Sequence, residues 1–480
     1  MTKHHANQLS AIDHIVVLML ENRSFDHMLG FLYADSNNVS PAGQPFEGLT
    51  GKESNPGASG TDTVFKIAAG QAHTYYQPGA DPGEGYAATN AQLFGNATAP
   101  TPPTATNQGF VDNYAATLAE ESKRKGGVLP GTVAADIMGM YTPQTLPVLS
   151  ALARGFAVCD HWFCSVPTET LPNRAFVNAG TSQGHMDDKT KAFTVPSIYG
   201  ALGEHGVSWA IYGYNAEPLT RLDFADLTNA PDGQFGQFAD FQAAAANGTL
   251  ASYSFLEPSW GSSGNSQHPN YDVALGEQLI HDVYYALRHG PAWNRTLLLV
   301  TYDEHGGCYD HVPPPTNAVP PDAAPGEFGF DFKRFGPRVP TVVISPWIPA
   351  GTVFRSSGAT PFDHTSILST IERRWGVPAL TARDAAAPDI ADVLSLSTPR
   401  TDDPLAGEVV PASKGINPAA GRPSHLQKVC AALAAQLPVR DTQGRRVPHT
   451  LPQLHTDADY DRYIGQRVAE WKASRNAPAP

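Results

Sequence analysis

The fold of this chain is decided by one apolar run, His14-Ile-Val-Val-Leu-Met-Leu20, which passes directly into the polar pair Glu21-Asn22. Near-continuous apolarity over five to seven residues is typical of a strand buried on both faces of a parallel sheet. Runs of the same kind follow at residues 155–159, 207–213, 296–302 and 339–345. We therefore predict a buried sheet that contains all of these runs.

Helical patterns lie between the apolar runs, most clearly at residues 142–153, 272–288 and 365–375. Alternation of strands and helices is typical of layered α/β proteins. The sequence thus predicts an α/β fold whose central, mostly parallel sheet is sandwiched by helices.

The 480 residues include 43 glycines and 42 prolines, which predicts many loops. We expect a catalytic domain over residues 1–398, with loop-rich insertions near 36–107 and 215–267, the second placed as a cap over a cleft. The pattern changes after residue 398, where Pro-rich connections join two amphipathic segments at 424–437 and 457–473. We expect residues 399–480 to form a helical tail that packs on the main domain.

The net charge of −14 argues against a nucleic-acid partner, because phosphate-backbone binding needs a basic face. No apolar run approaches the about 18 residues that cross a bilayer, so we expect no transmembrane segment. Residues 1–10 are polar and show no signal-peptide pattern. The protein is then cytoplasmic, or exported with its leader missing from this chain. The sequence leaves the oligomeric state open.

Four cysteines lack the paired spacing of zinc ligands: Cys159, Cys164, Cys308 and Cys430. We expect free buried thiols, and a disulfide between two of them is the alternative.

Adjacent oxygen-bearing side chains follow two of the predicted strands. Glu21 and Asn22 end the first strand, and Asp303 and Glu304 end the strand at 296–302. Ligands of open α/β sheets bind beyond the carboxyl ends of the strands. Carboxylates placed together repel unless a cation neutralises them, and these oxygens suit a divalent ion such as Mg, Ca, Mn or Zn.

A threonine lies where a helix is predicted to start, in Thr170-Leu-Pro172-Asn173-Arg174, and Gly180 is a plausible stop. Thr170 is placed as the N-cap, with Thr168 as a competing candidate. A hydroxyl at a helix N-terminus faces free N–H groups, which favours phosphate. An ordinary capping threonine is the alternative reading.

Together these segments predict a metal-activated nucleophile. A divalent ion held by Glu21, Asn22, Asp303 and Glu304 would lower the pKa of the Thr170 hydroxyl, which would attack a phosphoester. Arg174 would stabilise the phosphoryl oxygens. Among 17 histidines, His268 and His305 are candidates to protonate the leaving group. His311 and His364 are further candidates, although Asp-His pairs at helix and loop starts often act only as caps.

Four motifs in register resemble the bacterial phosphoesterase family, which joins phosphatidylcholine-type phospholipases C with acid phosphatases in the alkaline phosphatase superfamily. They are Glu21-Asn-Arg-Ser-Phe-Asp-His27, Thr170-Leu-Pro-Asn-Arg174, Tyr302-Asp-Glu-His-Gly-Gly307 with Asp310-His-Val-Pro-Pro-Pro315, and Phe335-Gly-Pro-Arg-Val-Pro340. The resemblance covers about residues 12–395. It implies that Thr170 is both nucleophile and metal ligand, and that His268 is the best match to the family histidines near the leaving group.

The chain departs from the family pattern in the segment Asp81-Pro82-Gly83-Glu84, where family members often carry a histidine at the last position. A carboxylic acid there could change leaving-group protonation or metal preference. The resemblance predicts a phosphoester substrate, either a phospholipid or phosphorylcholine ester or a small monoester. A sulfatase or phosphonate-cleaving relative is an alternative, which Thr170 disfavours, and a non-catalytic metal-stabilised binding protein is another.

Overall fold

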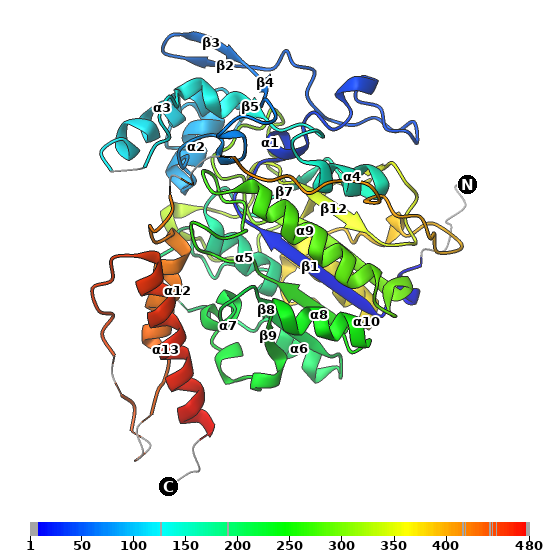
Figure 1. The fold of residues 1–480 in the computed structure, drawn as a ribbon, viewed down its shortest axis with the longest axis vertical. Helices are drawn as coiled ribbons and strands as arrows, with labels where there is room; N and C mark the ends of the chain where they lie inside the picture. The colour runs from blue at the N-terminus through cyan, green and yellow to red at the C-terminus, as the bar shows by residue number, and fades with distance from the viewer. Residues whose placement is uncertain are drawn as a thin grey trace.

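The computed structural model describes residues 8–476 apart from 125–126, 190–191, 415–416, 418, 441–442, 444 and 448. Its centre is an eight-stranded sheet with helices on both faces (Figure 1). In spatial order the strands are β13 (Thr352–Phe354), β6 (Ala157–Cys159), β12 (Thr341–Ile344), β11 (Thr296–Tyr302), β1 (His14–Leu20), β10 (Tyr253–Leu256), β8 (Trp209–Gly213) and β9 (Phe235–Gln237). Strand β12 runs antiparallel to both neighbours, and the other pairings are parallel.

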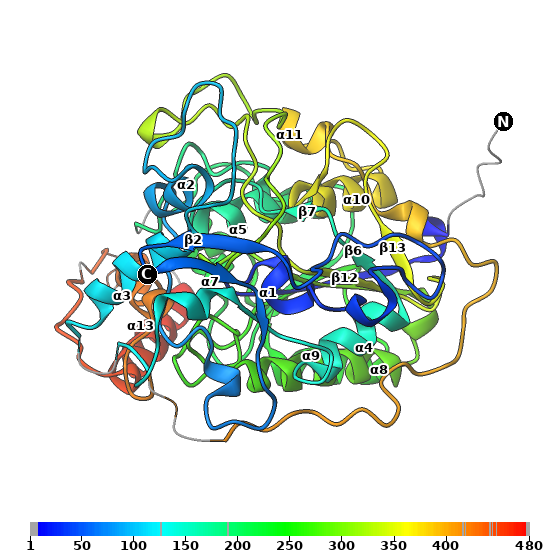
Figure 2. The same cartoon turned by 90° about the horizontal axis from the view of Figure 1, so that it is seen from above.

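Two helical layers enclose the sheet (Figure 2). One contains α4 (Pro147–Gly155), α8 (Phe238–Asn247) and α9 (Val273–Arg288), and the other contains α5 (Thr170–Ala179), α6 (Ile198–Glu204) and α10 (Thr365–Trp375). Because both faces are covered, Val16, Val17 and Leu18 of β1 are fully buried. This is the reason why β1 is apolar without alternation.

Smaller elements surround these layers. The segment between β1 and α4 forms α1 (Phe25–Leu29), β2 (Ser54–Gly57), β3 (Gly60–Thr63), β4 (Phe65–Lys66), α2 (Tyr86–Phe94), α3 (Phe110–Glu121) and β5 (Gly139–Met140). Later come β7 (Trp162–Phe163), α7 (Leu219–Asp223), β14 (Phe362–Asp363) and α11 (Ala382–Ala385). Near the C-terminus, α12 (His425–Gln436) packs against α7 and α13 (Asp457–Asn476).

The predicted fold class is confirmed: the sheet is mostly parallel and sandwiched by helices. The bounds of β1, β11 and α10 coincide with the predicted segments. Helix α4 begins at Pro147, later than predicted, because a proline restricts the residue before it to extended conformations.

Residues 215–267, expected to be a loop-rich cap, instead contribute β9 and β10 to the sheet. Strand β10 pairs directly with β1. The four residues 253–256 are too few for their pattern to distinguish a strand from a loop. They are buried in the structure because β10 lies beside β1. The division of the chain at residue 398 stays a prediction.

All four cysteines are buried and free, as expected. In the part of the chain that the structure describes, no helix combines the length and apolarity that a bilayer crossing requires.

Candidate active site

The two polar strand ends lie side by side. Strands β1 and β11 pair in register from His14 with Thr296 to Leu20 with Tyr302, so their next residues emerge together at one edge of the sheet. The backbone N–H of Asn22 donates to Asp303 Oδ1 at 2.8 Å. Glu21, Asn22, Asp303 and Glu304 are each at most 2% exposed. The predicted ligand set is therefore one buried cluster.

A glycine makes this close approach possible. Gly306 has φ +61°, and a Cβ there would lie 2.0 Å from the backbone oxygen of Asn22. Asn22 itself has φ +56°, a region that asparagine tolerates better than most residues. The turn after Glu304 thus needs glycine to bring the two strand ends together.

Helix α5 brings Thr170 to the same cluster. The Thr170 hydroxyl donates to Asn22 Oδ1 at 3.1 Å. The prediction that Thr170 is the N-cap was wrong by one residue: Glu169 is the N-cap and Thr170 the first helical residue. Thr168 is the competing candidate for the N-cap. Its hydroxyl donates instead to the backbone oxygen of Met186 at 2.7 Å. The helix ends at Gly180, which has φ +68°.

Two acidic residues that sequence reasoning missed hold the start of α5. Asp188 Oδ1 accepts a hydrogen bond from the N–H of Leu171 at 2.7 Å, and Glu169 Oε2 accepts one from the N–H of Asp188 at 2.6 Å. Because Leu171 follows Thr170, Asp188 fixes the backbone beside the predicted nucleophile. No local motif identifies Asp188, since it acts through the fold.

Arg174 lies one turn after Thr170 and faces the cluster. Its Nε donates to Asp303 Oδ2 at 2.9 Å, and its Nη2 donates to the backbone oxygens of Met19 and Leu20. The guanidinium lies 4.6 Å from the ring centre of Trp260. Its buried Nη1 has no hydrogen-bond partner among the described residues. One donor of a rigidly held cation is therefore available to an anion.

The carboxylates of the cluster have raised pKa values and unpaired oxygens. Burial, together with the neighbouring Asp303, raises the pKa of Glu21 to about 7. Burial and the same neighbour raise the pKa of Glu304 well above its usual value. Buried Glu21 Oε2 and Glu304 Oε1 lack hydrogen-bond partners within the described residues. Unpaired buried carboxylate oxygens fit a hard divalent ion.

His268 and Glu84 lie beside the cluster. The amide Nδ2 of Asn22 donates to Glu84 Oε2, and His268 Nε2 lies 3.9 Å from the same oxygen. His268 Nδ1 lies 3.0 Å from the backbone oxygen of Pro269, which leaves Nε2 directed at Glu84. Asp81 joins Glu84 and His268 in a group whose ligand atoms lie within 4.8 Å of one another. Glu84, the residue at the departure from the family pattern, thus lies beside the cluster.

His305 is held differently. Its Nε2 lies 2.7 Å from Gln92 Oε1, its Nδ1 lies 3.0 Å from Glu304 Oε2, and Phe110 packs edge-on against its ring. The imidazole is fully buried, and burial lowers its pKa to about 3. This placement favours a positioning role behind Glu304 over contact with a leaving group. His364 also lies behind the site, with Nε2 2.6 Å from the backbone oxygen of Asp303.

His311 belongs to a buried ion-pair network next to α1. Arg338 donates to Asp26 Oδ1 at 2.8 Å and to Asp310 Oδ1 at 2.9 Å, and His311 Nδ1 lies 2.6 Å from Asp26 Oδ2. Burial alone would raise the pKa of Asp26, but Arg338 and His311 hold it below its usual value. The three charged residues are fully buried, so this network ties α1 to the segments after β11 and before β12.

Replacing Arg338 with methionine should destabilise the fold by about 3–5 kcal/mol, because Asp26 and Asp310 would be left as uncompensated buried charges. With an unfolding entropy of about 2.1 cal/mol/K per residue, this is a fall in apparent Tm of about 3–5 °C. Differential scanning calorimetry measures it. Arg373→Ala is the control, because the Arg373–Asp389 pair is partly exposed and contributes about 1 kcal/mol or less. Equal shifts in the two variants would contradict the structural role of the network.

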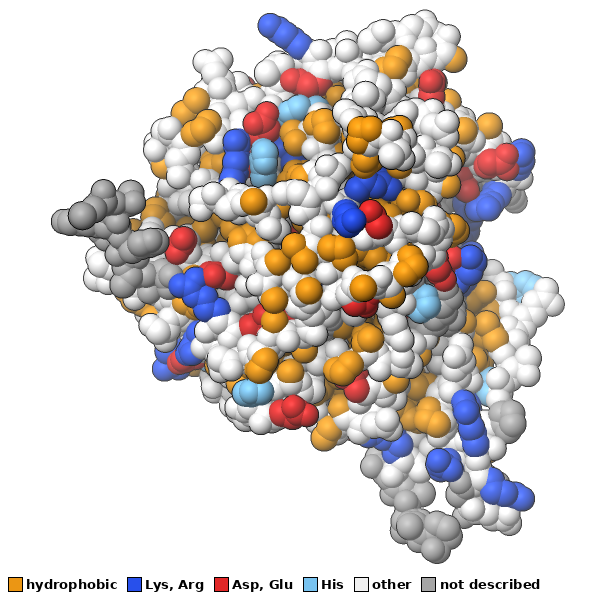
Figure 3. Space-filling view, turned by 180° about the vertical axis from the view of Figure 1, so that it is seen from behind, with side chains coloured by type: hydrophobic (Ala, Val, Ile, Leu, Met, Phe, Trp, Pro, Cys, Tyr) orange, Lys and Arg blue, Asp and Glu red, His pale blue; other side chains and the backbone are white. Residues whose placement is uncertain are grey.

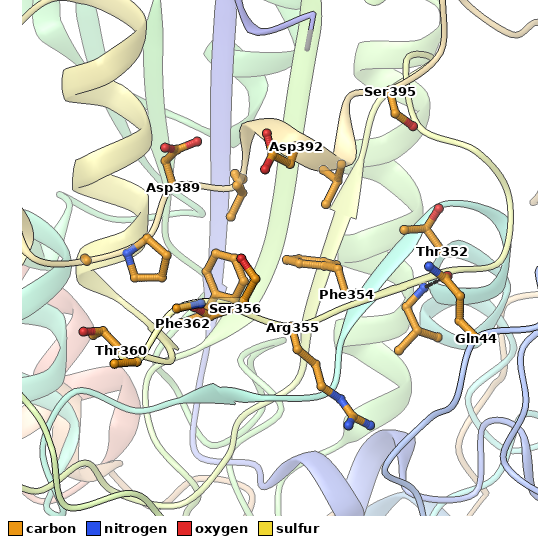
Figure 4. Close-up of a pocket in the computed structure, with 18 of the residues that line it drawn as sticks. Gln44, Thr352, Phe354, Arg355, Ser356, Thr360, Phe362, Asp389, Asp392 and Ser395 are labelled. Carbon is orange, nitrogen blue, oxygen red and sulfur yellow. Dashed lines mark hydrogen bonds between the residues drawn. The ribbon is translucent and has the colours of Figure 1, made fainter. Parts of the chain in front are cut away.

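A cavity of about 270 Å³ opens beside the site, and Asp81, Glu84 and Glu169 form part of its wall. A larger cavity of about 760 Å³ lies beside β13 and is lined by Phe354, Phe362 and residues of the 386–395 segment (Figure 4). None of the predicted site residues lines either cavity. The smaller cavity is the one next to the predicted site, because Glu84 contacts Asn22 and Glu169 precedes Thr170.

Comparison with known proteins gives the class of this protein, a hydrolase that acts on phosphoric ester bonds. The model of the Phosphoesterase family matches residues 12–378, and the chain belongs to this family. It is 38% identical to non-specific phospholipase C6 of Arabidopsis thaliana over 82% of this chain and 75% of that protein. It is 32% identical to phospholipase C A of Mycobacterium tuberculosis over 82% of this chain and 78% of that protein.

Among solved structures, one of a protein in the alkaline phosphatase superfamily from Vibrio parahaemolyticus aligns with a TM-score of 0.34 and 14% identity, covering 50% of this chain and 64% of that one.

Proposed function

We propose that this phosphoesterase is a metal-dependent phospholipase C that works through a covalent phosphothreonine on Thr170. The observation that carries the proposal is the contact between the Thr170 hydroxyl and Asn22 at the edge of a buried carboxylate cluster. A threonine hydroxyl there is within reach of the strand ends and of Arg174, and it lies at the positive end of a ten-residue helix. The similarity to phospholipases C favours a phospholipid over a small monoester.

Glu21, Asn22, Thr170, Asp303 and Glu304 would hold a divalent ion. When bound, the ion would lower the pKa of the Thr170 hydroxyl and offset the carboxylate charges. The unpaired oxygens of Glu21 and Glu304 are the observation that fits a metal. Mg, Ca, Mn and Zn all accept such a ligand set.

In the first step, Thr170 Oγ1 bonds to phosphorus and the bond from phosphorus to the leaving oxygen breaks. Arg174 Nη1 donates to a phosphoryl oxygen as charge develops. The proton of the Thr170 hydroxyl ends on the leaving alcohol, and His268 is the group placed to carry it.

In the second step, water attacks the phosphothreonine, the bond between Thr170 Oγ1 and phosphorus breaks, and the threonine hydroxyl is regenerated. His268 would take a proton from the water at Nε2, since its Nδ1 lies 3.0 Å from the backbone oxygen of Pro269. His305 keeps Glu304 in position.

A substrate panel tests this function. Purified protein supplied with each divalent ion is assayed with p-nitrophenyl phosphate, p-nitrophenylphosphorylcholine, bis-p-nitrophenyl phosphate, and phospholipid in mixed micelles. We expect diacylglycerol from the phospholipid and at least about tenfold faster turnover of the phosphorylcholine ester than of the monoester, a difference of about 1.4 kcal/mol in the barrier. Preference for the monoester would make the protein an acid phosphatase instead.

A further inference from the structure

The C-terminal segment, residues 419–476 as described, reaches the active site. Helix α12 packs beside α7, and its first turn contributes His425 and Lys428 to the lining of a cavity that Asp81, Glu84 and Glu169 also line. His425 Nε2 lies 3.3 Å from Asp188 Oδ2, and Asp188 in turn holds the N–H of Leu171 next to Thr170. The tail is therefore a wall of the site as well as a packing element.

The wall that the tail provides is basic. Arg422, His425 and Lys428 line the cavity, together with Arg124 from the end of α3. Burial lowers the pKa of Lys428, and Arg124 and Arg422 add to this effect while Glu121 opposes it. Arg124 pairs with Glu121 and His425 with Asp188. Lys428 has no ion pair within the described part of the chain. An anion would relieve the repulsion between these cations.

This basic character contrasts with the rest of the protein. Residues 399–480 contain 11 Lys and Arg against 8 Asp and Glu, whereas the whole chain contains 32 against 46. Basic side chains gather over the C-terminal segment at the lower right of Figure 3. His425 and Lys428 also occupy the first turn of α12, where the helix dipole disfavours cations. An unfavourable local arrangement of this kind is expected at functional sites.

Acidic residues also line the cavity, and one of them, Glu121, pairs with Arg124. Asp81, Glu84 and Glu169 come from the 81–84 segment and from the residue before Thr170. Glu84 accepts a hydrogen bond from Asn22, and its Oε2 lies 3.9 Å from His268 Nε2. A molecule that fills the cavity therefore meets both carboxylates and cations.

The cavity is small. Its volume of about 270 Å³ is below the range of about 300–1,000 Å³ for pockets that hold drug-sized ligands. It suits a polar headgroup and is too small for two acyl chains. The diacylglycerol part of a substrate must then lie outside it.

We propose that the C-terminal segment builds the headgroup subsite of the enzyme, and that this subsite prefers a headgroup carrying both an ammonium and a carboxylate. The ammonium lies against Asp81, Glu84 and Glu169, and the carboxylate binds Lys428. This inference rests on the proposed phosphoester hydrolysis and adds the class of headgroup. It also gives the tail a role in substrate choice.

A matched pair of headgroup phosphates tests the subsite, because O-phosphoserine and phosphoethanolamine differ by one carboxylate. Each is titrated against the hydrolysis of p-nitrophenyl phosphate by the metal-loaded full-length protein. We expect the inhibition constant of O-phosphoserine to be about fivefold lower than that of phosphoethanolamine, the size of a partly exposed charge pair. In Lys428→Ala this difference should vanish, with the constant for phosphoethanolamine changed less than twofold.

The control is Arg462→Ala, which removes a solvent-exposed cation of α13 that does not line the cavity. It should keep the fivefold preference. Equal inhibition of the wild-type protein by the two compounds would overturn the proposal, as would an equal loss of both affinities in Lys428→Ala.

Calorimetric titration of the same compounds separates this inference from the proposed function. If the protein turns over no phosphoester but still binds O-phosphoserine more tightly in a Lys428-dependent way, the catalytic proposal fails and the subsite stands. If turnover is normal and neither method shows the preference, the subsite fails alone.

Discussion

Thr170→Ala should reduce kcat for every phosphoester substrate by about 10⁴-fold to 10⁶-fold, the range expected when a catalytic nucleophile is removed. The reason is that no covalent phosphoryl intermediate can form, while the buried ligands and Arg174 keep their places. Thr170 is 2% exposed and its hydroxyl makes one hydrogen bond, to Asn22. The fold should therefore be retained, with a change in apparent Tm of about 1 °C or less. Steady-state kinetics and calorimetry on the same preparation measure both quantities.

Thr170→Ser is the matched control, because it keeps a hydroxyl at the first position of α5. We expect its kcat to lie within about tenfold of the wild-type value. If Thr170→Ala kept more than about 1% of the activity, the hydroxyl would not be the nucleophile, and an attacking water would have to replace it.

Removal of divalent cations should have the second largest effect. Chelation with EDTA followed by desalting should lower turnover by at least about 10³-fold, and one of Mg, Ca, Mn or Zn should restore it. The apparent Tm should fall as well, because Glu21, Asp303 and Glu304 would again face one another without a neutralising charge. Metal analysis of the purified protein gives the identity of the ion and the number bound per chain.

The variant Asp303→Asn tests whether the cluster binds the divalent ion. Asp303 is chosen because it contacts both Asn22 and Arg174. We expect the variant to bind the ion at least about tenfold more weakly, whereas Asp331→Asn, which changes an exposed carboxylate, should bind it normally. Full activity and an unchanged Tm after chelation would contradict the prediction. They would show that protonation of the carboxylates, and not a bound metal ion, offsets their repulsion.

The central sheet and the meeting of its two polar strand ends could be inferred from sequence because both follow from one local signal. A strand buried on both faces is apolar throughout, so its end is marked by the first polar residue, and Glu21 and Asp303 are such residues. The register of β1 and β11 then places their ends together. The same signal is absent from β10, whose four residues are too few to show a pattern, although it pairs with β1.

The surroundings of the site could not be predicted, because they depend on contacts between distant loops. Asp188 acts by accepting a hydrogen bond from Leu171, and Gln92 acts by holding His305. Neither residue has a local pattern that sets it apart. The surroundings of His305 were hidden for the same reason: its imidazole is enclosed by Gln92 and Phe110, which come from distant segments.

The most direct test of the account is detection of the phosphothreonine itself. The metal-loaded enzyme is mixed with p-nitrophenyl phosphate, quenched in acid within the first turnover, digested, and analysed by mass spectrometry. We predict one added phosphoryl group on the peptide that contains Thr170, absent from Thr170→Ala. Turnover by the wild-type protein without this adduct, or with the adduct on another residue, would contradict the account.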